Sequence, residues 1–422
     1  MVETRPVFGF RPAEVSGMAN LAVLETHASE AGFIWTQRDR AVRASHFRLE
    51  HLGRLDARLE GHLQGLRLGG DAAARLTAVQ LAECDAGAVF ANTWLTFGGN
   101  DFQHIGGVLS LACSSPEFAR AAAAAIAWLG EEVSGQVIAL LQRVDHPIHG
   151  YLLLAAQAGK RHDVDTAIKR CLETPNSVAR EHALRLVGEL RRRDFLPALH
   201  AAIADPEPGC RISAAQSLLL LGEPTGADTL GDAILAGQAT TRRTIEILAR
   251  CAPREWVRDL VRVLAGSSGT RRLAILGAGA LGDPAAVPWL LGLMSESELA
   301  RVCGEALSMM TGIDLALMDL DRDPDASEDD PGESGHPDDA DLPWPDAGAI
   351  EQWWSVHRAS MPAGDRHLLG LRMTSETAVL ALKQGYQRQR FAASIELSTL
   401  HPDKAVFPVA ARARLQQRGL AR

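Results

Sequence analysis

The stretch "LGDPAAVPWLL", residues 281–291, indicates how this chain of 422 residues folds. Gly282 follows an apolar run, and glycine readily takes the left-handed conformation that ends many helices. Asp283 is a favoured residue just before a helix, and Pro284 suits the first helical position because that position needs no N–H donor. These three residues therefore predict the end of one helix and the start of the next.

A similar turn, "LGEP" at 221–224, places Gly222 60 residues before Gly282. Steps of about 30 residues align units that each contain an apolar helical stripe, a short break, a second stripe and a polar turn. The units are 120–149, 150–179, 180–210, 211–240, 241–270 and 271–300, and a seventh opens at Arg301. A fixed period with two helices per unit predicts a helical solenoid.

The best unit, "GALGDPAAVPWLLGLM" (279–294), and its weaker copies resemble the short HEAT-like repeats of phycobilisome lyases. The resemblance covers roughly 120–310. It implies an all-α fold, an α-α superhelix of the HEAT-like or armadillo type. It implies no single function, because the same repeat serves lyases, hydroxylases, DNA-binding enzymes and plain scaffolds.

The residues before the repeats predict an N-terminal helical cap with divergent repeats over 1–119, followed by the HEAT-like repeats over 120–318. In the cap, leucines recur at helical spacing and predict one apolar helix face. They are Leu52, Leu55, Leu59, Leu63 and Leu66.

Residues 319–346 hold 12 Asp or Glu, five Pro and one Arg, a net charge of −11. The rest of the chain therefore carries +2 of the total of −9. Such a composition cannot bury an apolar core and predicts a disordered, acidic, Pro-rich linker. Residues 347–422 are net basic and predict a small C-terminal helical segment.

Two further stretches, "ETHASEAGFIWTQRDRAVRASHFRLEHLGRLDARLEGHLQGLR" (25–67) and "GYQRQRFAASIELSTLHPD" (385–403), support a second resemblance, together with "DRHLLG" (365–370). They look like the ends of a bacterial family of HEAT-like proteins that are often encoded near type VI secretion genes. The resemblance implies a role in or beside a secretion system and supplies no catalytic residues.

Two histidine-containing stretches, "HPIH" and "RHDVD", offer His146, His149, His162 and Asp163 as metal ligands. Pro147 breaks the helix that would align the first pair, so these residues are better interpreted as solvent-facing turns. The stretch "DLDRDPDASEDD" (319–330) resembles a calcium loop, but Pro324 stands where the loop needs glycine. We predict no metal and no cofactor.

The stretch "GAGALG" (277–282) has the glycine spacing of a dinucleotide-binding loop. No strand precedes it, and it lies within a repeat helix. Its small residues are better explained by neighbouring helices that approach closely. The chain also has no Gly-x-Ser-x-Gly nucleophile setting and no phosphate-binding Gly-x4-Gly-Lys-Ser/Thr loop.

An arginine recurs near the start of most units, and we call these residues the arginine series: Arg120, Arg180, Arg211, Arg242, Arg271 and Arg301. They could bond carbonyl groups or an Asp of the inter-repeat turns, such as Asp205. Alternatively, they form an exposed basic strip for an acidic partner. Nucleic acid is disfavoured as a partner, because residues 1–318 sum to −4 and lack interleaved aromatic and basic residues.

Trp344, between two prolines, is an apolar anchor in the acidic segment. We hypothesise that this segment lies along Arg242, Arg271 and Arg301, or against the basic C-terminal segment. The alternative is a solvated tether with no fixed position. The candidate partner-binding residues are Arg180, Arg211, Arg242, Arg271, Arg301 and Trp344.

The sequence has no apolar run of the roughly 18 residues that cross a bilayer, and its start lacks a secretory pattern. We therefore predict a bacterial cytoplasmic protein without membrane insertion. The predicted function is a non-catalytic scaffold or adaptor for protein–protein interaction, linked to type VI secretion in an accessory or immunity-type role. The alternative is an enzyme on a HEAT scaffold, such as a nucleic-acid glycosylase or a cofactor lyase.

Overall fold

The computed structural model describes residues 20–81, 85–99, 105–143, 146, 148–160, 164–238, 240–324 and 336–421. These residues are predominantly helical, which confirms the predicted all-α repeat fold. The chain forms two compact units. Unit 1 comprises Met1–Arg40 and Gly53–Ala179, and unit 2 comprises Ala41–Leu52 and Arg180–Arg422. The boundary predicted at residue 119 falls inside unit 1.

The first nine helices belong mainly to unit 1. They are α1 (Leu21–Ala41), α2 (Leu49–Leu68), α3 (Gly70–Gln80), α4 (Ala86–Gly98), α5 (Ile105–Ser114), α6 (Pro116–Trp128), α7 (Glu131–Leu141), α8 (His149–Lys160) and α9 (Asp165–Leu172).

Helix α4 is the centre of unit 1, because its residues are buried from Ala86 to Phe97. Helix α1 crosses it closely, and a Cβ atom added at Gly87 would lie 2.5 Å from the Gly32 carbonyl oxygen. One turn further on, the rings of Trp35 and Phe90 stack with centroids 5.1 Å apart. Close packing at these positions fixes α1 on α4.

Helix α2 lies against α1 and buries the leucine face that its sequence predicts. The five leucines of that face are at most 7% exposed. Near the connection between the two helices, the Arg38 guanidinium donates to the Asp56 carboxylate at 2.9 Å, and both side chains are buried. The predicted amphipathic helix is therefore confirmed, with a buried ion pair beside its apolar face.

The elements of unit 2 follow along the chain. They are α10 (Ser177–Glu189), η3 (Arg193–Phe195), α11 (Leu196–Ala202), α12 (Pro208–Leu220), α13 (Thr225–Leu235), α14 (Arg242–Cys251), α15 (Arg254–Ala265), α16 (Ser268–Leu281), η4 (Pro284–Ala286), α17 (Val287–Leu293), α18 (Ser297–Thr311), η5 (Pro337–Asp339), α19 (Ala347–His357), η6 (Arg358–Ser360), β1 (His367–Leu368), β2 (Leu371–Arg372), α20 (Ser375–Gln384), α21 (Gln387–Leu400) and α22 (Ala413–Leu420).

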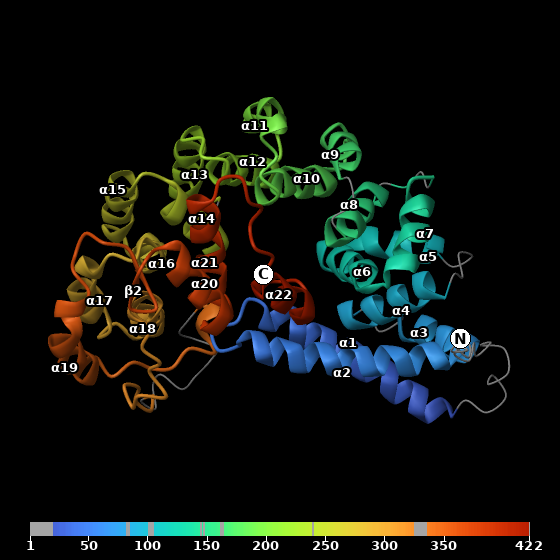
Figure 1. The fold of residues 1–422 in the computed structure, drawn as a ribbon, viewed down its shortest axis with the longest axis horizontal. Helices are drawn as coiled ribbons and strands as arrows, with labels where there is room; N and C mark the ends of the chain where they lie inside the picture. Colours follow the sequence, from blue (N-terminus) through green and yellow to red (C-terminus); the bar gives the residue numbers. More distant parts are fainter. Residues whose placement is uncertain are drawn as a thin grey trace, which may run out of the picture. The chain divides into compact units, whose positions relative to one another are not determined.

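The repeats of unit 2 form two layers of helices (Figure 1). Helices α12, α14, α16 and α18 stack as the inner layer, and α11, α13, α15 and α17 form the outer layer. Helices α20 and α21 lie against the inner layer, where α21 packs on α12 and α14. The C-terminal segment thus covers part of the inner face of the repeats.

The turn that indicates the fold has the predicted geometry. Gly282 ends α16 with φ of 68°, and Gly222 ends α12 with φ of 83°. The Asp283 carboxylate accepts a hydrogen bond from the Ala285 N–H at 3.1 Å, and Pro284 opens the short helix η4. The local signals for stopping and starting a helix are confirmed at this turn.

The small residues of "GAGALG" lie inside α16, where they are buried. A Cβ atom on Gly279 would lie 2.9 Å from the Ala306 Cα atom, and one on Gly277 would lie 3.0 Å from the Val261 side chain. The glycines therefore let α16 approach its neighbours closely, as the sequence interpretation expects.

The C-terminal segment shares its core with the repeats. Ile350 of α19 and Ile395 of α21 belong to the hydrophobic cluster that runs through α12 to α18. A second cluster joins Met309 of α18 to Leu368 of β1 and to Ala392 of α21. Residues 347–421 therefore form part of unit 2.

The described ends of the acidic segment are ordered, which differs from the disordered linker that composition predicts. Asp321 and Pro345 form an antiparallel bridge. On either side of it, the Arg322 N–H donates to the Trp344 carbonyl at 2.9 Å, and the Asp346 N–H donates to the Leu320 carbonyl at 2.9 Å. The two described ends of the segment therefore pair with each other. Residues 325–335 lie outside the described residues.

Candidate functional site

The arginine series lies in the first two turns of α6, α10, α12, α14, α16 and α18. Arg180 donates twice to the Asp205 carboxylate, at 3.1 Å each. Burial alone would raise the pKa of Asp205, but the hydrogen bonds from Arg180 and the Glu207 N–H, together with the charges of Arg180 and Arg211, outweigh it and lower that pKa. Arg211 donates to the carbonyl groups of Asp205 at 2.8 Å and Pro206 at 2.9 Å. These two arginines thus bond the inter-repeat turn, as the first interpretation proposes.

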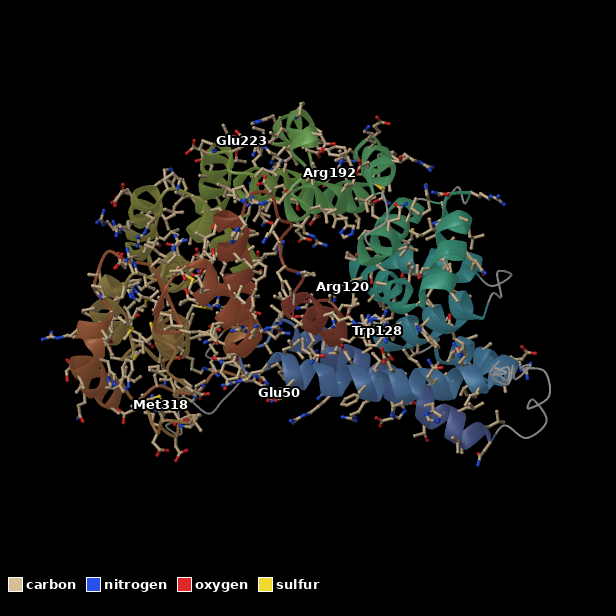
Figure 2. The ribbon with its side chains drawn as sticks, viewed as in Figure 1. Glu50, Arg120, Trp128, Arg192, Glu223 and Met318 are labelled. Atoms are coloured by element: carbon tan, nitrogen blue, oxygen red, sulfur yellow. The ribbon has the colours of Figure 1, made fainter. Side chains whose placement is uncertain are left out.

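Two members of the series form ion pairs that face solvent. Arg271 pairs with Glu296 at 2.9 Å, and their side chains are 28% and 47% exposed. In unit 1, Arg120 lies 3.5 Å from Asp39 and its side chain is 44% exposed. Figure 2 shows Arg120 together with Trp128 on α6, where the Trp128 ring faces the Arg38 guanidinium at 5.8 Å. Solvent-exposed ion pairs contribute only about 0–1 kcal/mol, so they are easily exchanged.

Arg242 belongs instead to a buried cluster on the inner face of unit 2. On α14, Arg242, Glu246 and Arg250 follow one another at intervals of four residues and so share one side of the helix. Arg242 hydrogen-bonds Glu305 of α18 and lies 3.8 Å from Glu246.

The C-terminal segment supplies the other members of this cluster. Arg388 of α21 donates to Glu305 at 2.6 Å. Glu396, also on α21, accepts from Arg250 at 2.8 Å and from Arg366 at 2.7 Å. We call the cluster the inner charge network: Arg242, Glu246, Arg250, Glu305, Arg366, Arg388 and Glu396. It joins α14, α18 and α21 through charges that are paired with one another.

Glu246 is the most enclosed carboxyl group of the network, at 2% exposure. Burial raises its pKa, while the positive charges of Arg242 and Arg250 act in the opposite direction. A small recess beside it is lined by Arg242, Glu246, Glu305, Gly279 and Met309. The arginine and glutamate side chains around this recess bond each other. They occupy the inner face of the repeats, where a helical solenoid could otherwise have an open groove.

Sequence reasoning missed most of this network. The spacing of four residues along "RRTIEILARC" (242–251) could have indicated a charged stripe on α14. Nothing local could have identified its partners, because Glu305 and Glu396 are 63 and 146 residues away from the arginines that they bind.

Trp344 and Arg301 lie together where the two described ends of the acidic segment pair. The Trp344 ring is buried between two guanidinium groups, 4.8 Å from Arg301 and 5.3 Å from Arg322. Nearby, the buried Asp339 carboxylate accepts two hydrogen bonds from Arg272, at 2.9 and 2.7 Å.

Among the described contacts, the acidic segment meets the series at Arg301, which faces the Trp344 ring and donates to the Ala340 carbonyl. Its Asp339 carboxylate bonds Arg272, which the sequence analysis did not select. Arg271 pairs with Glu296 and Arg242 with Glu305. The segment also contacts the C-terminal region, since Arg388 donates to the Asp338 carbonyl at 2.7 Å.

The histidine candidates for a metal site make local contacts. His149 Nδ1 lies 2.5 Å from the His146 carbonyl oxygen, and His146 Nδ1 lies 3.8 Å from Cys113 Sγ. His162 and Asp163 lie outside the described residues. Within the part of the chain that is described, no group of three or more potential ligands is gathered at one point. Nor does any described helix combine the length and apolar character needed to span a bilayer.

Comparison with known proteins gives one match. Residues 164–244 match the family model described as HEAT repeats. No curated protein and no solved structure matches the chain. The paired helices, their stacked layers and this match identify the chain as an all-α helical repeat protein with HEAT-like repeats.

Proposed function

We propose that the protein is a non-catalytic scaffold that binds another protein. The observation that carries this proposal is the inner charge network. A catalytic pocket needs polar groups that are free to meet a substrate. In unit 2, the corresponding groups of α14 and α18 bond the chain's own α21, through pairs such as Arg250–Glu396 and Arg388–Glu305. Stacked helical repeats commonly serve as protein-binding surfaces, which supports the same conclusion.

Within unit 2, we place the partner's contact at the edge that carries Arg271. Exchanging the exposed Arg271–Glu296 pair for a pair with a partner's carboxylate loses little free energy. Breaking the Arg180–Asp205 or Arg242–Glu305 pair would leave a largely buried charge unpaired, which is strongly destabilising. Arg271 is therefore the member of the series in unit 2 best suited to an acidic partner, whereas Arg180 and Arg242 stabilise the fold.

The test compares three forms of the full chain as bait in the native bacterial host, with crosslinking before purification. They are the wild type, Arg271→Glu and the matched control Arg262→Glu. Arg262 is a highly exposed arginine on α15 that pairs only with its neighbour Asp259 among the described contacts. We expect one protein to be captured by the wild type and the control and to be lost from the Arg271 variant. Capture that is equal for all three baits would refute a contact at Arg271.

The link to type VI secretion rests on the resemblance of the chain ends alone, and we propose it as the setting of the scaffold in a bacterial cytoplasm. The same purification in a host strain without the secretion genes tests it. We expect the captured protein to be absent from that strain because the secretion cluster encodes it. Capture of the same protein from both strains would leave the scaffold role intact and refute the secretion link.

A further inference from the structure

Two histidines face each other between α1 and α2 in unit 1. His27 Nδ1 and His62 Nδ1 are 3.1 Å apart, and the ring centroids are 5.2 Å apart at an interplanar angle of 68°. Both side chains are partly exposed, so protons reach them from solvent. Gly65, one turn after His62, leaves room for the His27 ring, because a Cβ atom there would lie 2.6 Å from His27 Nε2.

The two histidines lie near the start of α1 and the end of α2, far from the segment that connects these helices. Their contact holds this end of α1 against α2. At this end Leu21 and Val23 are exposed, and only Leu24 and Ala28 are buried among the first residues of α1. The other end is held by the buried Arg38–Asp56 pair. The imidazole contact is therefore one of the few interactions that hold the first turns of α1, beside the buried side chains of Leu24 and Ala28 and the exposed contacts of Ser29 with Gln80 and of Glu30 with Arg58.

That contact can exist in only some protonation states. An imidazole–imidazole hydrogen bond needs one Nδ1–H donor and one Nδ1 lone pair as acceptor. With no added proton, or with one, the pair can keep this bond. With two added protons both Nδ1 atoms carry hydrogen, and two positive rings face each other at 3.1 Å. The rings must then separate.

We propose that the His27–His62 pair is a proton-operated clasp, which holds the start of α1 against α2 at neutral pH and releases it in mild acid. The segment that is released is residues 21–31. Residues 34–41 stay in place because Ile34 and Trp35 are buried in unit 1 and Arg38 keeps its pair with Asp56.

The charged groups around the pair set the pH of release. Burial lowers the pKa of His62, and the charges of His27 and Arg58 lower it further, while Glu30 acts in the opposite direction. Arg58 and Glu30 lie 3.8 Å apart across the same two helices. The second protonation of the pair therefore falls below the ordinary histidine value of about 6.5.

The test is hydrogen–deuterium exchange of the full chain at pH 7.0 and pH 5.0, corrected for the intrinsic effect of pH. In the wild type we expect peptides from residues 21–31 to exchange roughly fivefold faster at the lower pH, the effect of losing one hydrogen bond. Peptides from 34–41 should not change. The double variant His27→Gln, His62→Gln should show no such pH dependence. His200→Gln, at an exposed histidine on α11, is the matched control and should behave as the wild type does.

An NMR titration of the imidazole C–H signals gives a second readout that needs no folded double variant. We expect the signals of the two rings to change together in two steps, with the second step below the ordinary histidine value of about 6.5. Independent titration of both rings near the ordinary value would overturn the clasp. So would equal protection of residues 21–31 at both pH values.

Discussion

The carboxylate of Asp283 accepts a hydrogen bond from the backbone N–H of Gly364 at 2.9 Å, across 81 residues of sequence. Beside it, the His367 N–H donates to the Gly282 carbonyl at 2.8 Å, and a Cβ atom on Gly282 would lie 2.4 Å from the His367 carbonyl oxygen. The turn between α16 and α17 thus also holds the segment that leads into β1. The same turn therefore connects two helices of the repeat and binds the C-terminal region.

Replacing Asp283 with Ala should therefore destabilise the protein by more than the loss of a helix cap. The variant loses the bonds from Ala285 and Gly364 and leaves Arg258 without its 2.6 Å partner. We expect a loss of about 3 kcal/mol in the free energy of unfolding, measured in urea. The control is Glu223→Ala in the related turn, where the side chain pairs only with an exposed arginine among the described contacts. Its loss should stay below about 1 kcal/mol.

The same carboxylate makes stability depend on pH. Burial alone would raise the pKa of Asp283, but hydrogen bonds from Gly364, Ala285 and Arg258 outweigh it and hold the pKa below its usual value. The stabilisation is therefore complete above the unfolded pKa of about 3.9 and is lost as the pH falls through the lower folded pKa. The free energy of unfolding should be measured for the wild type and for Asp283→Asn from pH 6 to pH 3. We expect the difference between the two proteins to decrease only below about pH 4. A difference that is constant over this range would assign the stabilisation to another group.

Ala214 tests the register of α12, since its side chain is fully buried. Ala214→Asp places a carboxylate without a partner in the core, and we expect a loss of several kcal/mol, about 4, in the free energy of unfolding. Ala201→Asp, at an exposed position of α11, is the matched control and should change stability by less than about 0.5 kcal/mol. Similar melting temperatures for the two variants would contradict the assigned register.

The close approach of α16 and α18 makes Gly279 sensitive to a single methyl group. Its Cβ atom would lie 2.9 Å from both the Cα and the Cβ atoms of Ala306, and backbone cannot move aside cheaply. We expect Gly279→Ala to destabilise by about 1–3 kcal/mol. At Gly292 on α17 an added Cβ meets nothing within 4 Å, so Gly292→Ala should be neutral or stabilising by up to about 1 kcal/mol. Thermal unfolding of both variants checks the difference in sign.

The two glutamates near Arg242 should differ in importance. Glu305 accepts from Arg242 and from Arg388, so Glu305→Gln weakens two buried ionic contacts, and we expect a loss of about 3 kcal/mol. Burial already disfavours the charge of Glu246, so Glu246→Gln should lose less than about 1 kcal/mol. Denaturant unfolding at pH 7 measures both. Equal losses would mean that Glu246 contributes to the network as strongly as Glu305 does.

The local structure of this protein is determined by its sequence alone. Gly282, Asp283 and Pro284 end one helix and begin another within three residues, and the leucines of α2 define a buried face by their spacing. Such signals act over one or two helical turns. At that range, the preferred backbone conformation and the apolar periodicity are enough to predict where a helix ends and which face it buries. The repeat period is visible in the sequence because the units repeat an apolar stripe, a short break, a second stripe and a polar turn, although the residues of the break vary.

Apart from Asp205, which the sequence offered as a partner for the arginine series, the partners of the charged residues were decided by the tertiary structure. Arg180 and Arg271 belong to the same sequence series, yet one bonds a largely buried Asp and the other an exposed Glu. Trp344 and Asp339 lie in an acidic stretch that composition predicts to be disordered, and both are buried against the repeats by arginines 43 and 67 residues away. An ion pair or a ring contact depends on which surfaces the folded chain brings within a few ångströms and removes from water. That arrangement follows from the stacking of distant helices and is not contained in any local pattern of residues.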